Sequence, residues 1–282
     1  MEQDNTTDVR LSVSIVLYNS PLELLLRTLD SLALSVADAS RFRSIPHVDV
    51  HIIDNSQETA SRDETRSALA KCTAGELLNL RYIENGENSG FGAGHNKVLD
   101  SLDSTYHLIL NPDAELAEET VEAGIACMLD EPGTVLLSPQ VWSDGGHQEF
   151  LCKRYPSVLV LLLRAFAPRF VRWFFRRRLH HYEMRDACAS DQPSDVLLAS
   201  GCFMLVSTAA LQEVGGFDER YFLYFEDFDL SLKLGAKGRK VYHPDMKIVH
   251  HGGYAARKGM LHVKLFVRSG IQFFRSHGWR WI

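Results

Sequence analysis

Short β-rich runs alternate with helix-forming segments through the first half of the sequence, and this alternation constrains the fold more than any other feature. A polar or glycine-rich cluster follows most of the apolar runs. This pattern favours an α/β fold with a mostly parallel central sheet flanked by helices. The expected strands are residues 11–17, 48–53, 80–83, 106–110 and 135–141, and the expected helices are residues 21–35, 61–72 and 118–129.

The second half of the chain is patterned less regularly. No clear strand pattern is present in residues 142–194. Further along, we expect an apolar strand at 197–206, a helix at 226–234, a short strand at 247–249 and a closing helix at 258–276.

Composition excludes several classes of protein. A net charge of −6 argues against nucleic-acid binding, which requires a basic surface. The five cysteines are odd in number and form no CxxC pair, so they indicate reduced thiols of a cytosolic protein. Residues 1–8 are polar and acidic, so we expect no secretory signal. No run approaches the ~18 apolar residues of a membrane-spanning helix.

Polar residues follow three of the expected strands. Asp54, the glycine-rich turn Gly90–Gly94 and Asp113 each stand at a strand's carboxyl end. Ligands of parallel α/β sheets bind outside these ends, so the three sites are expected to converge on one crevice.

The glycine-rich turn lies within Asn88–Asn96 and does not have the GxGxxG spacing of a dinucleotide-binding fingerprint. Glycines before a helix allow the backbone to approach a phosphate or sugar closely. They also serve a tight strand-to-helix turn, and the sequence favours neither role over the other.

Carboxylates and imidazoles that suit a divalent cation follow two strands. Asp113 and Glu115 lie just beyond residues 106–110, and oxygen ligands of this kind suit Mg²⁺ or Mn²⁺. The alternative role for these acids is to cap the following helix. His250 and His251 follow the short strand and would either supply an imidazole to the same ion or serve the structure.

Acidic residues among aromatic ones distinguish the segment Phe217–Leu230. A carboxylate in apolar surroundings is costly unless it is paired or used. At least one of Glu226, Asp227 and Asp229 is therefore expected to line a partly dry cleft, where a shifted pKa suits a general base. The alternative is a helix N-terminus, where acids meet the positive end of the dipole.

A basic segment stands out in this acidic chain. Six arginines and no acid occur from Arg164 to Arg178. Helical spacing predicts one face with Arg169, Arg172 and Arg176 and another with Phe170, Trp173 and Phe174. Basic amphipathic helices of this composition lie in membrane interfaces and favour anionic lipid. The alternatives are a helix packed on the domain with solvated arginines, or a dimer contact.

Taken together, these segments resemble glycosyltransferase family 2, the inverting nucleotide-sugar transferases of the GT-A fold. The nearest subgroup is the rhamnosyltransferase-like enzymes of bacterial polysaccharide assembly, such as O-antigen synthesis. The matching segments, in chain order, are Ser14–Asn19, Ile53–Ser56, Asn88–Asn96, Asn111–Asp113, Ser200–Met204, Phe217–Leu230 and His250. Residues 142–194 are the part least covered.

The resemblance implies a role for each matching position. Asp227 would be the general base, and Glu226 would help to place the acceptor. Asp113 and His250 would hold Mg²⁺ or Mn²⁺, although Asn111 replaces the first acid of the family's Asp-x-Asp and removes one charge. The residues implied in nucleotide-sugar binding are Tyr18, Asn19, Asp54, Asn55, Gly90, Phe91, Gly92, Asn96, Asn111 and Asp113.

The implied activity is inverting transfer of a sugar, rhamnose from dTDP-rhamnose, to a lipid-linked glycan at the inner face of the cell membrane. The alternatives are a UDP-sugar donor and a non-enzymatic peripheral membrane scaffold. A sugar-1-phosphate nucleotidyltransferase is disfavoured, because the segment Tyr18–Pro21 offers no basic glycine-rich loop.

We expect three parts: a nucleotide-sugar-binding α/β half (1–141), a basic amphipathic insertion (142–195), and an acceptor-side catalytic half with the closing helix (196–282). A homodimer is compatible with this arrangement.

Overall fold

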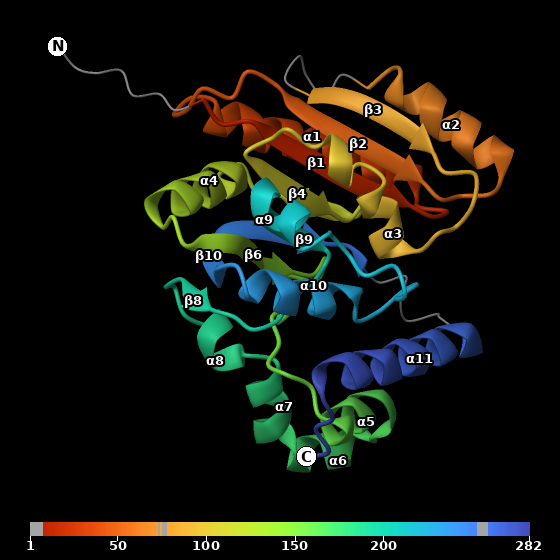
Figure 1. Ribbon diagram of the computed structural model, residues 1–282, viewed down its shortest axis with the longest axis vertical. Coiled ribbons are helices and arrows are strands. Elements are labelled where there is room, and N and C mark those ends of the chain that lie inside the picture. The colour runs from red at the N-terminus through yellow and green to blue at the C-terminus, as the bar shows by residue number, and fades with distance from the viewer. Residues whose placement is uncertain (1–7, 73, 75–77, 253–258) are drawn as a thin grey trace.

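The computed structural model describes residues 8–72, 74, 78–252 and 259–282, and one ten-stranded sheet runs through this part of the chain (Figure 1). Its order is β3-β2-β1-β4-β9-β6-β10-β5, with β7 paired to β6 and β8 to β10. The strands are β1 (Leu11–Leu17), β2 (Val48–Asp54), β3 (Leu78–Glu84), β4 (Tyr106–Leu110), β5 (Ala114–Leu116), β6 (Thr134–Trp142), β7 (Gln148–Glu149), β8 (Ser194–Asp195), β9 (Phe203–Ser207) and β10 (Arg239–His250).

Helices cover both faces of the sheet. Buried leucines of α1 and apolar residues of α4 belong to one core, whereas residues of α9 and α10 belong to a second core on the other face. The helices are α1 (Leu22–Ala39), α2 (Thr59–Leu69), α3 (Phe91–Asn96), α4 (Thr120–Asp130), α5 (Val158–Phe166), α6 (Arg169–Phe174), α7 (Arg176–Tyr182), α8 (Arg185–Cys188), α9 (Thr208–Glu213), α10 (Glu226–Gly235) and α11 (Met260–His277), with a 3₁₀ turn at Leu99–Ser101. The predicted α/β class and the mostly parallel sheet are confirmed.

The strands β5, β7 and β8 were not predicted, and two others begin well away from the predicted residue. β10 begins at Arg239 instead of residue 247, because its first part carries charges and a proline that hide the strand pattern. The register shift between His243 and Lys247 accommodates that proline. β9 begins at Phe203 instead of residue 197, because Gly201 and Cys202 form a turn. The closing helix begins at Met260, and the predicted start at Lys258 lies outside the described residues.

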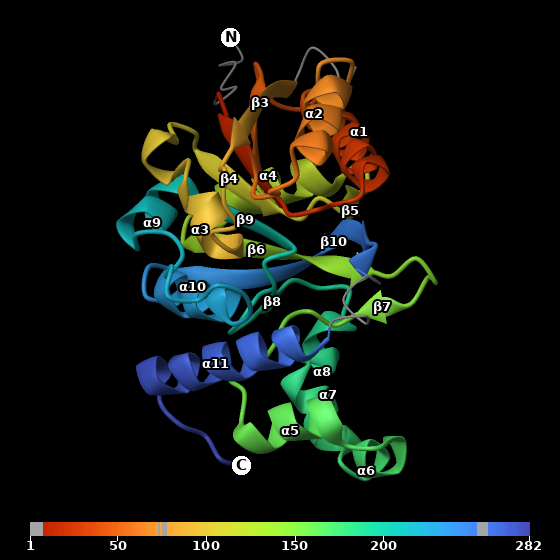
Figure 2. The ribbon, with the colours of Figure 1, turned by 90° about the vertical axis from the view of Figure 1, so that its right-hand side faces the viewer.

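Residues 142–195 form the strands β7 and β8, which join the sheet, and between them the four short helices α5–α8, which extend to one end of the molecule (Figure 2). α11 lies alongside α5, and the backbone N–H of Val158 donates to the carbonyl of Arg280 at 2.8 Å. The sheet takes strands from all three predicted parts, and the division into 1–141, 142–195 and 196–282 stays a prediction. Within the described residues we find no helix that combines the length and apolar character needed to cross a bilayer.

Strand direction brings the predicted site residues to one edge. Leu17 at the end of β1 pairs with Asp54 at the end of parallel β2. The antiparallel strand β9 starts at the same edge, because Phe203 pairs with Leu110 at the end of β4. Similarly, the last residue of β10 pairs with Ala114 of β5.

The glycine loop closes this edge against the segment that precedes α10. Gly90 has φ of +93°, and a Cβ there would lie 2.3 Å from the carbonyl oxygen of Phe222. The N–H of Phe91 donates to that same oxygen at 3.2 Å. Only glycine allows this close approach of two backbone segments, so the tight-turn role accounts for Gly90.

We therefore expect Gly90→Ala to lower the free energy of unfolding by about 2–4 kcal/mol, since the new methyl combines left-handed strain with a backbone clash. Gly86→Ala is the matched control, because Gly86 also has a left-handed φ (+72°) but has no atom within 4 Å of the added Cβ. Its cost should be about 1 kcal/mol. Urea unfolding measures both, and equal losses would contradict the role of the Phe222 contact.

Candidate active site

The ends of β1 and β2 present residues predicted to border a nucleotide. Tyr18 is 51% exposed at the end of β1. Asn19 has a left-handed backbone (φ 49°), and its N–H donates to Oγ of Ser56 at 2.9 Å. Asparagine tolerates this conformation better than most residues. The turn therefore holds the Tyr18 ring at the edge of the sheet, where a flat base could stack on it.

Asp54 is buried and fixed by two donors. The N–H of Ser56 donates to its Oδ1 at 2.8 Å, and the hydroxyl of Tyr82 donates to its Oδ2 at 2.6 Å. Burial, followed by the Asp54 contact, raises the pKa of Tyr82. A carboxylate has about four lone-pair sites. Asp54 thus keeps the capacity to accept a further N–H, such as that of a pyrimidine.

Several other predicted nucleotide-binding residues make contacts within the protein. Asn55 donates to the carbonyl of Gly90 at 3.0 Å. A Cβ on Gly92 would meet the side chain of Phe217 at 2.7 Å. The Asn96 side chain donates to the carbonyl of Phe217 and accepts from its N–H, both at 2.9 Å. The Phe91 ring packs edge-on against the ring of Phe217. These residues hold the loop in place, and their direct contact with a nucleotide stays a prediction.

Asp113 and His250 come together as predicted. Oδ1 of Asp113 lies 3.4 Å from Nε2 of His250, and the amide nitrogen of Asn111 lies 3.3 Å from the same Nε2. Glu149 on β7 approaches the other ring nitrogen at 3.7 Å. Burial opposes protonation of His250, but the two carboxylates outweigh it and raise its pKa to about 9. This corner therefore favours positive charge.

The neighbouring residues His251 and Glu115 form ion pairs of their own. Nε2 of His251 lies 2.7 Å from Glu115, its other ring nitrogen contacts Asp144, and Glu115 also forms an ion pair with Arg27 at 2.6 Å. The backbone N–H of His251 donates to the carbonyl of Asp113 at 2.9 Å. His251 and Glu115 thus pair with each other, while Asp113 faces His250.

A divalent cation fits the Asp113–His250 corner. The buried Oδ1 of Asp113 has no hydrogen-bond partner among the described atoms. Carboxylate and imidazole ligands suit Mn²⁺ and Mg²⁺, which usually keep waters and substrate phosphates as further ligands. The described residues hold no ready-made group of three His, Cys, Asp or Glu ligands, so two protein ligands would leave positions open for a diphosphate.

Asp227 and Glu226 occupy the first turn of α10, directly after two residues in left-handed conformation. Tyr224 and Phe225 have φ of 71° and 67°, which is costly for aromatic residues. Packing compensates for this strain, because Phe225 is buried and its ring lies 5.1 Å from that of Phe266. The strained turn aims Asp227 at Gly201, whose N–H donates to Oδ2 at 3.1 Å.

Burial dominates the electrostatics of the acid pair. Burial raises the pKa of Asp227, although hydrogen bonds from Gly201 and Phe228 oppose the shift. Burial, followed by the Asp227 charge, raises the pKa of Glu226, whose Oε2 is buried and unpartnered among the described atoms. Both groups line a cavity of about 200 Å³. The expectation of acids in a partly dry cleft is confirmed, and the alternative role at a helix N-terminus holds as well.

The two acidic centres meet around Cys202. The N–H of Asn111 donates to the Cys202 carbonyl at 2.9 Å, one residue from the Gly201 contact with Asp227. Burial raises the pKa of the Cys202 thiol to about 12, and the charges of Asp113 and Asp227 act in the same direction. Both carboxylates therefore lie close to one buried thiol.

Three residues that line the Asp227 cavity were not predicted as residues of the catalytic site: Lys153, Arg164 and Tyr182. Lys153 is buried, donates to the carbonyl of Phe150, and has its pKa lowered to about 8, first by burial and then by Arg164. The Arg164 guanidinium lies 5.4 Å from the centre of the Tyr182 ring. Lys153 could not be recognised from the sequence as a site residue, because its burial depends on tertiary packing.

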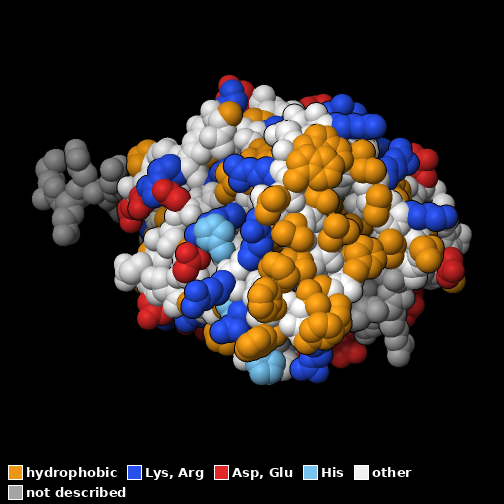
Figure 3. Space-filling model, turned by 90° about the horizontal axis from the view of Figure 1, so that it is seen from below, with side chains coloured by type: hydrophobic (Ala, Val, Ile, Leu, Met, Phe, Trp, Pro, Cys, Tyr) orange, Lys and Arg blue, Asp and Glu red, His pale blue; other side chains and the backbone are white. Residues whose placement is uncertain are grey.

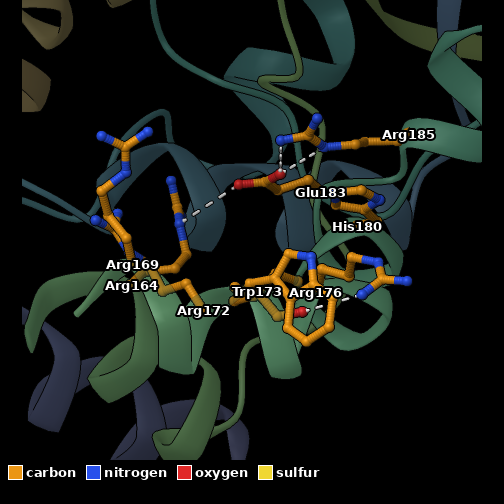
Figure 4. Close-up of a pocket in the computed structure, with 9 residues that line it drawn as sticks. Arg164, Arg169, Arg172, Trp173, Arg176, His180, Glu183 and Arg185 are labelled. Atoms are coloured by element: carbon orange, nitrogen blue, oxygen red, sulfur yellow. Dashed lines mark hydrogen bonds and ion pairs between the residues drawn. The ribbon is translucent and has the colours of Figure 1, made fainter. Parts of the chain in front are cut away.

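The basic segment differs from the predicted helix. It is broken between α6 and α7, and Arg169, Arg172 and Arg176 line one hollow (Figure 4). Trp173 lies with these arginines, and the Arg176 guanidinium is 4.8 Å from its ring centre. The prediction that Trp173 lies on a separate face is wrong, because residues three and four apart are neighbours on a helix surface, which places Trp173 beside Arg169 and Arg176.

The comparison with known families agrees with this geometry. The model of the family described as "Glycosyl transferase family 2" matches residues 12–215. This chain belongs to glycosyl transferase family 2. The match includes β1, the glycine loop and the Asn111–Asp113 corner, and it ends before α10.

Two relatives of this family 2 member are rhamnosyltransferases. The N-acetylglucosaminyl-diphospho-decaprenol L-rhamnosyltransferase of Mycobacterium tuberculosis (strain CDC 1551 / Oshkosh) is 29% identical over 220 residues, covering 71% of this chain and 69% of its own. The rhamnosyltransferase WbbL of Escherichia coli (strain K12) is 24% identical over 216 residues, covering 72% and 76%.

Among solved structures, GalNAc-T7 with UDP, GalNAc and Mn²⁺ has a TM-score of 0.62 at 13% identity. The alignment covers 96% of this chain but 48% of GalNAc-T7, so the chain spans about half the length of that protein. At this identity the likeness establishes the GT-A fold alone.

We predict that Asp227→Asn lowers kcat about 10²–10⁴-fold, the usual contribution of a positioned general base, while donor binding persists. Asp218→Asn is the matched control, because Asp218 lies in the same segment but pairs with exposed Arg220. Initial rates and donor affinity measure the two effects. Near-normal turnover of Asp227→Asn would remove the residue from this role.

The Asp227 carboxylate should also give the wild-type enzyme a pH signature, which a pH–rate profile measures and which Asp227→Asn should lack. A base acts in its deprotonated form, so kcat should fall as the pH falls through the pKa of Asp227. Because burial raises that pKa, the acid limb should lie above the ordinary aspartate value of about 4.

We further predict that Mn²⁺ increases the thermal stabilisation given by dTDP or UDP, and that Asp113→Ala and His250→Ala each remove this metal-dependent part. Glu115→Gln is the control, since Glu115 pairs with His251 and Arg27. Melting curves with and without Mn²⁺ measure the effect. Loss of the metal effect in Glu115→Gln alone would assign the ion to the neighbouring pair.

Proposed function

We propose that this family 2 glycosyltransferase transfers rhamnose, with inversion, from dTDP-rhamnose to the sugar of a lipid-linked diphosphate acceptor. The observation that carries the proposal is the pairing of a partly buried, cavity-lining acid at Asp227 with a cation-favouring corner at Asp113 and His250 on one sheet edge. The two rhamnosyltransferase relatives support the donor sugar, and the printed name of the M. tuberculosis protein supports a lipid-linked acceptor.

In this reaction the Asp227 carboxylate takes the proton of the acceptor hydroxyl. The oxygen forms a bond to the anomeric carbon of the donor on the face opposite the leaving group. The bond from that carbon to the phosphate oxygen breaks, and the nucleoside diphosphate leaves with the electron pair. This geometry matches the base of inverting glycosidases, which activates a nucleophile on the opposite face.

The other residues prepare this step. Gly201 and Phe228 fix the two carboxylate oxygens of Asp227 through their N–H groups. Glu226, with its raised pKa, would donate a hydrogen bond to an acceptor hydroxyl. Asp113 and His250 would hold Mg²⁺ or Mn²⁺, which neutralises charge on a departing diphosphate. Asp54 would accept the pyrimidine N–H, and Tyr18 would stack on the base.

We also infer that the enzyme works as a peripheral protein at a membrane surface in the cytoplasm. A lipid-linked acceptor keeps its chain in or near the bilayer, so the enzyme must reach that surface. The arginines of α6 and α7 support this inference, since anionic lipid attracts such segments.

The test is a transfer assay with a donor panel of dTDP-rhamnose, UDP-N-acetylglucosamine and UDP-galactose, and a prenyl-diphospho-N-acetylglucosamine acceptor. We expect dTDP-rhamnose to be preferred and the product linkage to be inverted relative to the donor, as read by NMR. A UDP-sugar as the preferred donor would replace rhamnose in the proposal. A product that retains the donor configuration would contradict the role of Asp227 as base.

A further inference from the structure

An apolar groove runs between α5 and α11 at the end of the molecule farthest from β3. It encloses about 530 Å³ and is lined mainly by aliphatic and aromatic side chains. Several of these are well exposed, including Leu162 (51%), Phe166 (66%) and Val267 (48%). Figure 3, seen from this end, shows the hydrophobic side chains gathered in a band with Lys and Arg along its edge. Exposed apolar areas of this kind usually mark a binding surface.

The walls of the groove are held together by hydrogen bonds and stacking. Residues after α11 run back along α5, where Leu159 donates its N–H to the carbonyl of Trp281 at 3.1 Å. The hydroxyl of Tyr155 donates to the carbonyl of Gly278 at 2.6 Å. Trp279 stacks on Phe274 with ring centres 5.1 Å apart. The groove is therefore a formed feature of the fold and does not depend on a loose tail.

The groove adjoins the cavity of Asp227. Leu161, Arg164, Tyr224 and Phe266 line both of them. A molecule lying in the groove is thus separated from the acid-lined cavity only by these shared side chains. The unpartnered Oε2 of Glu226 offers a polar contact in that cavity.

A basic hollow adjoins both. It measures about 610 Å³ and is lined by five arginines against the single carboxylate of Glu183 (Figure 4). Glu183 pairs with Arg185 at 2.7 Å and lies 3.7 Å from Arg164. Among the described residues no carboxylate pairs with Arg169, Arg172 or Arg176. Guanidinium groups bind phosphate oxygens in bidentate fashion, so this hollow suits a diphosphate.

Arg164 lines all three hollows and defines how they are arranged. Apolar groove, arginine cluster and catalytic cavity meet at this side chain. A ligand that combines a hydrocarbon chain, a strong anion and a sugar has one part to match each of these three hollows. A bilayer or a second copy of the chain would account for an exposed apolar surface, but not for the walls that it shares with the Asp227 cavity.

We propose that these three hollows form one binding track for a prenyl diphosphate-linked acceptor. The prenyl chain lies in the α5–α11 groove, the diphosphate contacts Arg164 and the arginines of α6 and α7, and the attached sugar reaches Asp227. The placement of the sugar rests on the proposed function, whereas binding of the prenyl diphosphate does not.

The first experiment measures binding without any transfer reaction. Farnesyl diphosphate, farnesol and inorganic diphosphate are titrated separately into the full chain by isothermal titration calorimetry. Val267→Glu should weaken farnesyl diphosphate about tenfold or more relative to inorganic diphosphate, since it places a charge in the apolar groove. The double variant Arg172→Ala, Arg176→Ala should weaken both diphosphates. Leu162→Glu, on the opposite wall, is the second groove variant.

Leu34→Glu is the matched control, because Leu34 is a similarly exposed apolar residue (58%) on α1, outside all three hollows. It should leave farnesyl diphosphate binding within about twofold of wild type. Equal weakening of both diphosphates by Val267→Glu, or weakening of neither, would overturn the groove assignment. So would strong binding of farnesyl diphosphate in the double arginine variant.

Two further measurements test whether a membrane or a second copy of the chain occupies the groove instead. Flotation with anionic vesicles that contain no prenyl lipid tests the membrane, and sedimentation tests a second copy of the chain. If Val267→Glu abolishes vesicle binding or splits a dimer while farnesyl diphosphate binding stays intact, the groove is a docking surface and the proposal fails.

A final comparison uses transfer. In the groove variants, KM for a long-chain prenyl diphosphate acceptor should rise about tenfold relative to KM for an analogue without the chain. An unchanged ratio would contradict the track. Absence of transfer with every donor would instead contradict the proposed function, and the farnesyl diphosphate titration would still decide the groove.

Discussion

The close approach of Gly90 to the carbonyl of Phe222 is the constraint on which the rest of the site depends. It joins the turn after β3 to the segment before α10, and the missing side chain of Gly90 makes it possible. Two asparagines hold the same loop in place. Asn55, which follows β2, donates to the carbonyl of Gly90, and Asn96 donates to the carbonyl of Phe217. Because both backbone segments are fixed there, the left-handed residues that start α10 can be held in place, and Asp227 is delivered to Gly201.

The edge of the sheet therefore carries two acidic centres in different environments. Asp113 faces an imidazole that favours protonation, so that corner supports positive charge. Asp227 lies in a partly dry cleft, where removal from water raises its pKa and makes it a stronger base than an ordinary aspartate. Glycosyl transfer requires both environments, one for the departing diphosphate and one for the incoming hydroxyl. The fold places the two acids on different elements. Asp113 follows β4, whereas Asp227 lies in the first turn of α10, which packs against β6 and β10.

Much of this arrangement could be predicted from sequence, because it depends on patterns within short segments of the chain. The strands β1, β2, β4 and β6 carry short apolar runs, and their polar ends mark Asp54 and Asp113 as site residues without further information. Lys153, Glu149 and the full length of β10 could not be predicted in this way. Their placement depends on pairing between segments far apart in the chain, as in the bridge from Lys153 to Leu198. The break at Phe175 was also hidden, because no glycine or proline marks it.

Folding alone does not explain the composition of α5 to α7. Arginines without a carboxylate partner contribute little to stability, and neutral polar residues at exposed positions would serve the fold equally well. Exposed Phe166, Phe170 and Phe174 leave apolar surface in water, which is a cost to solubility. These features are explained together if this end of the molecule meets a ligand that is apolar along one part and strongly anionic along the next. The position of Arg164, between the groove, the arginines and Asp227, is what makes one ligand sufficient for all three.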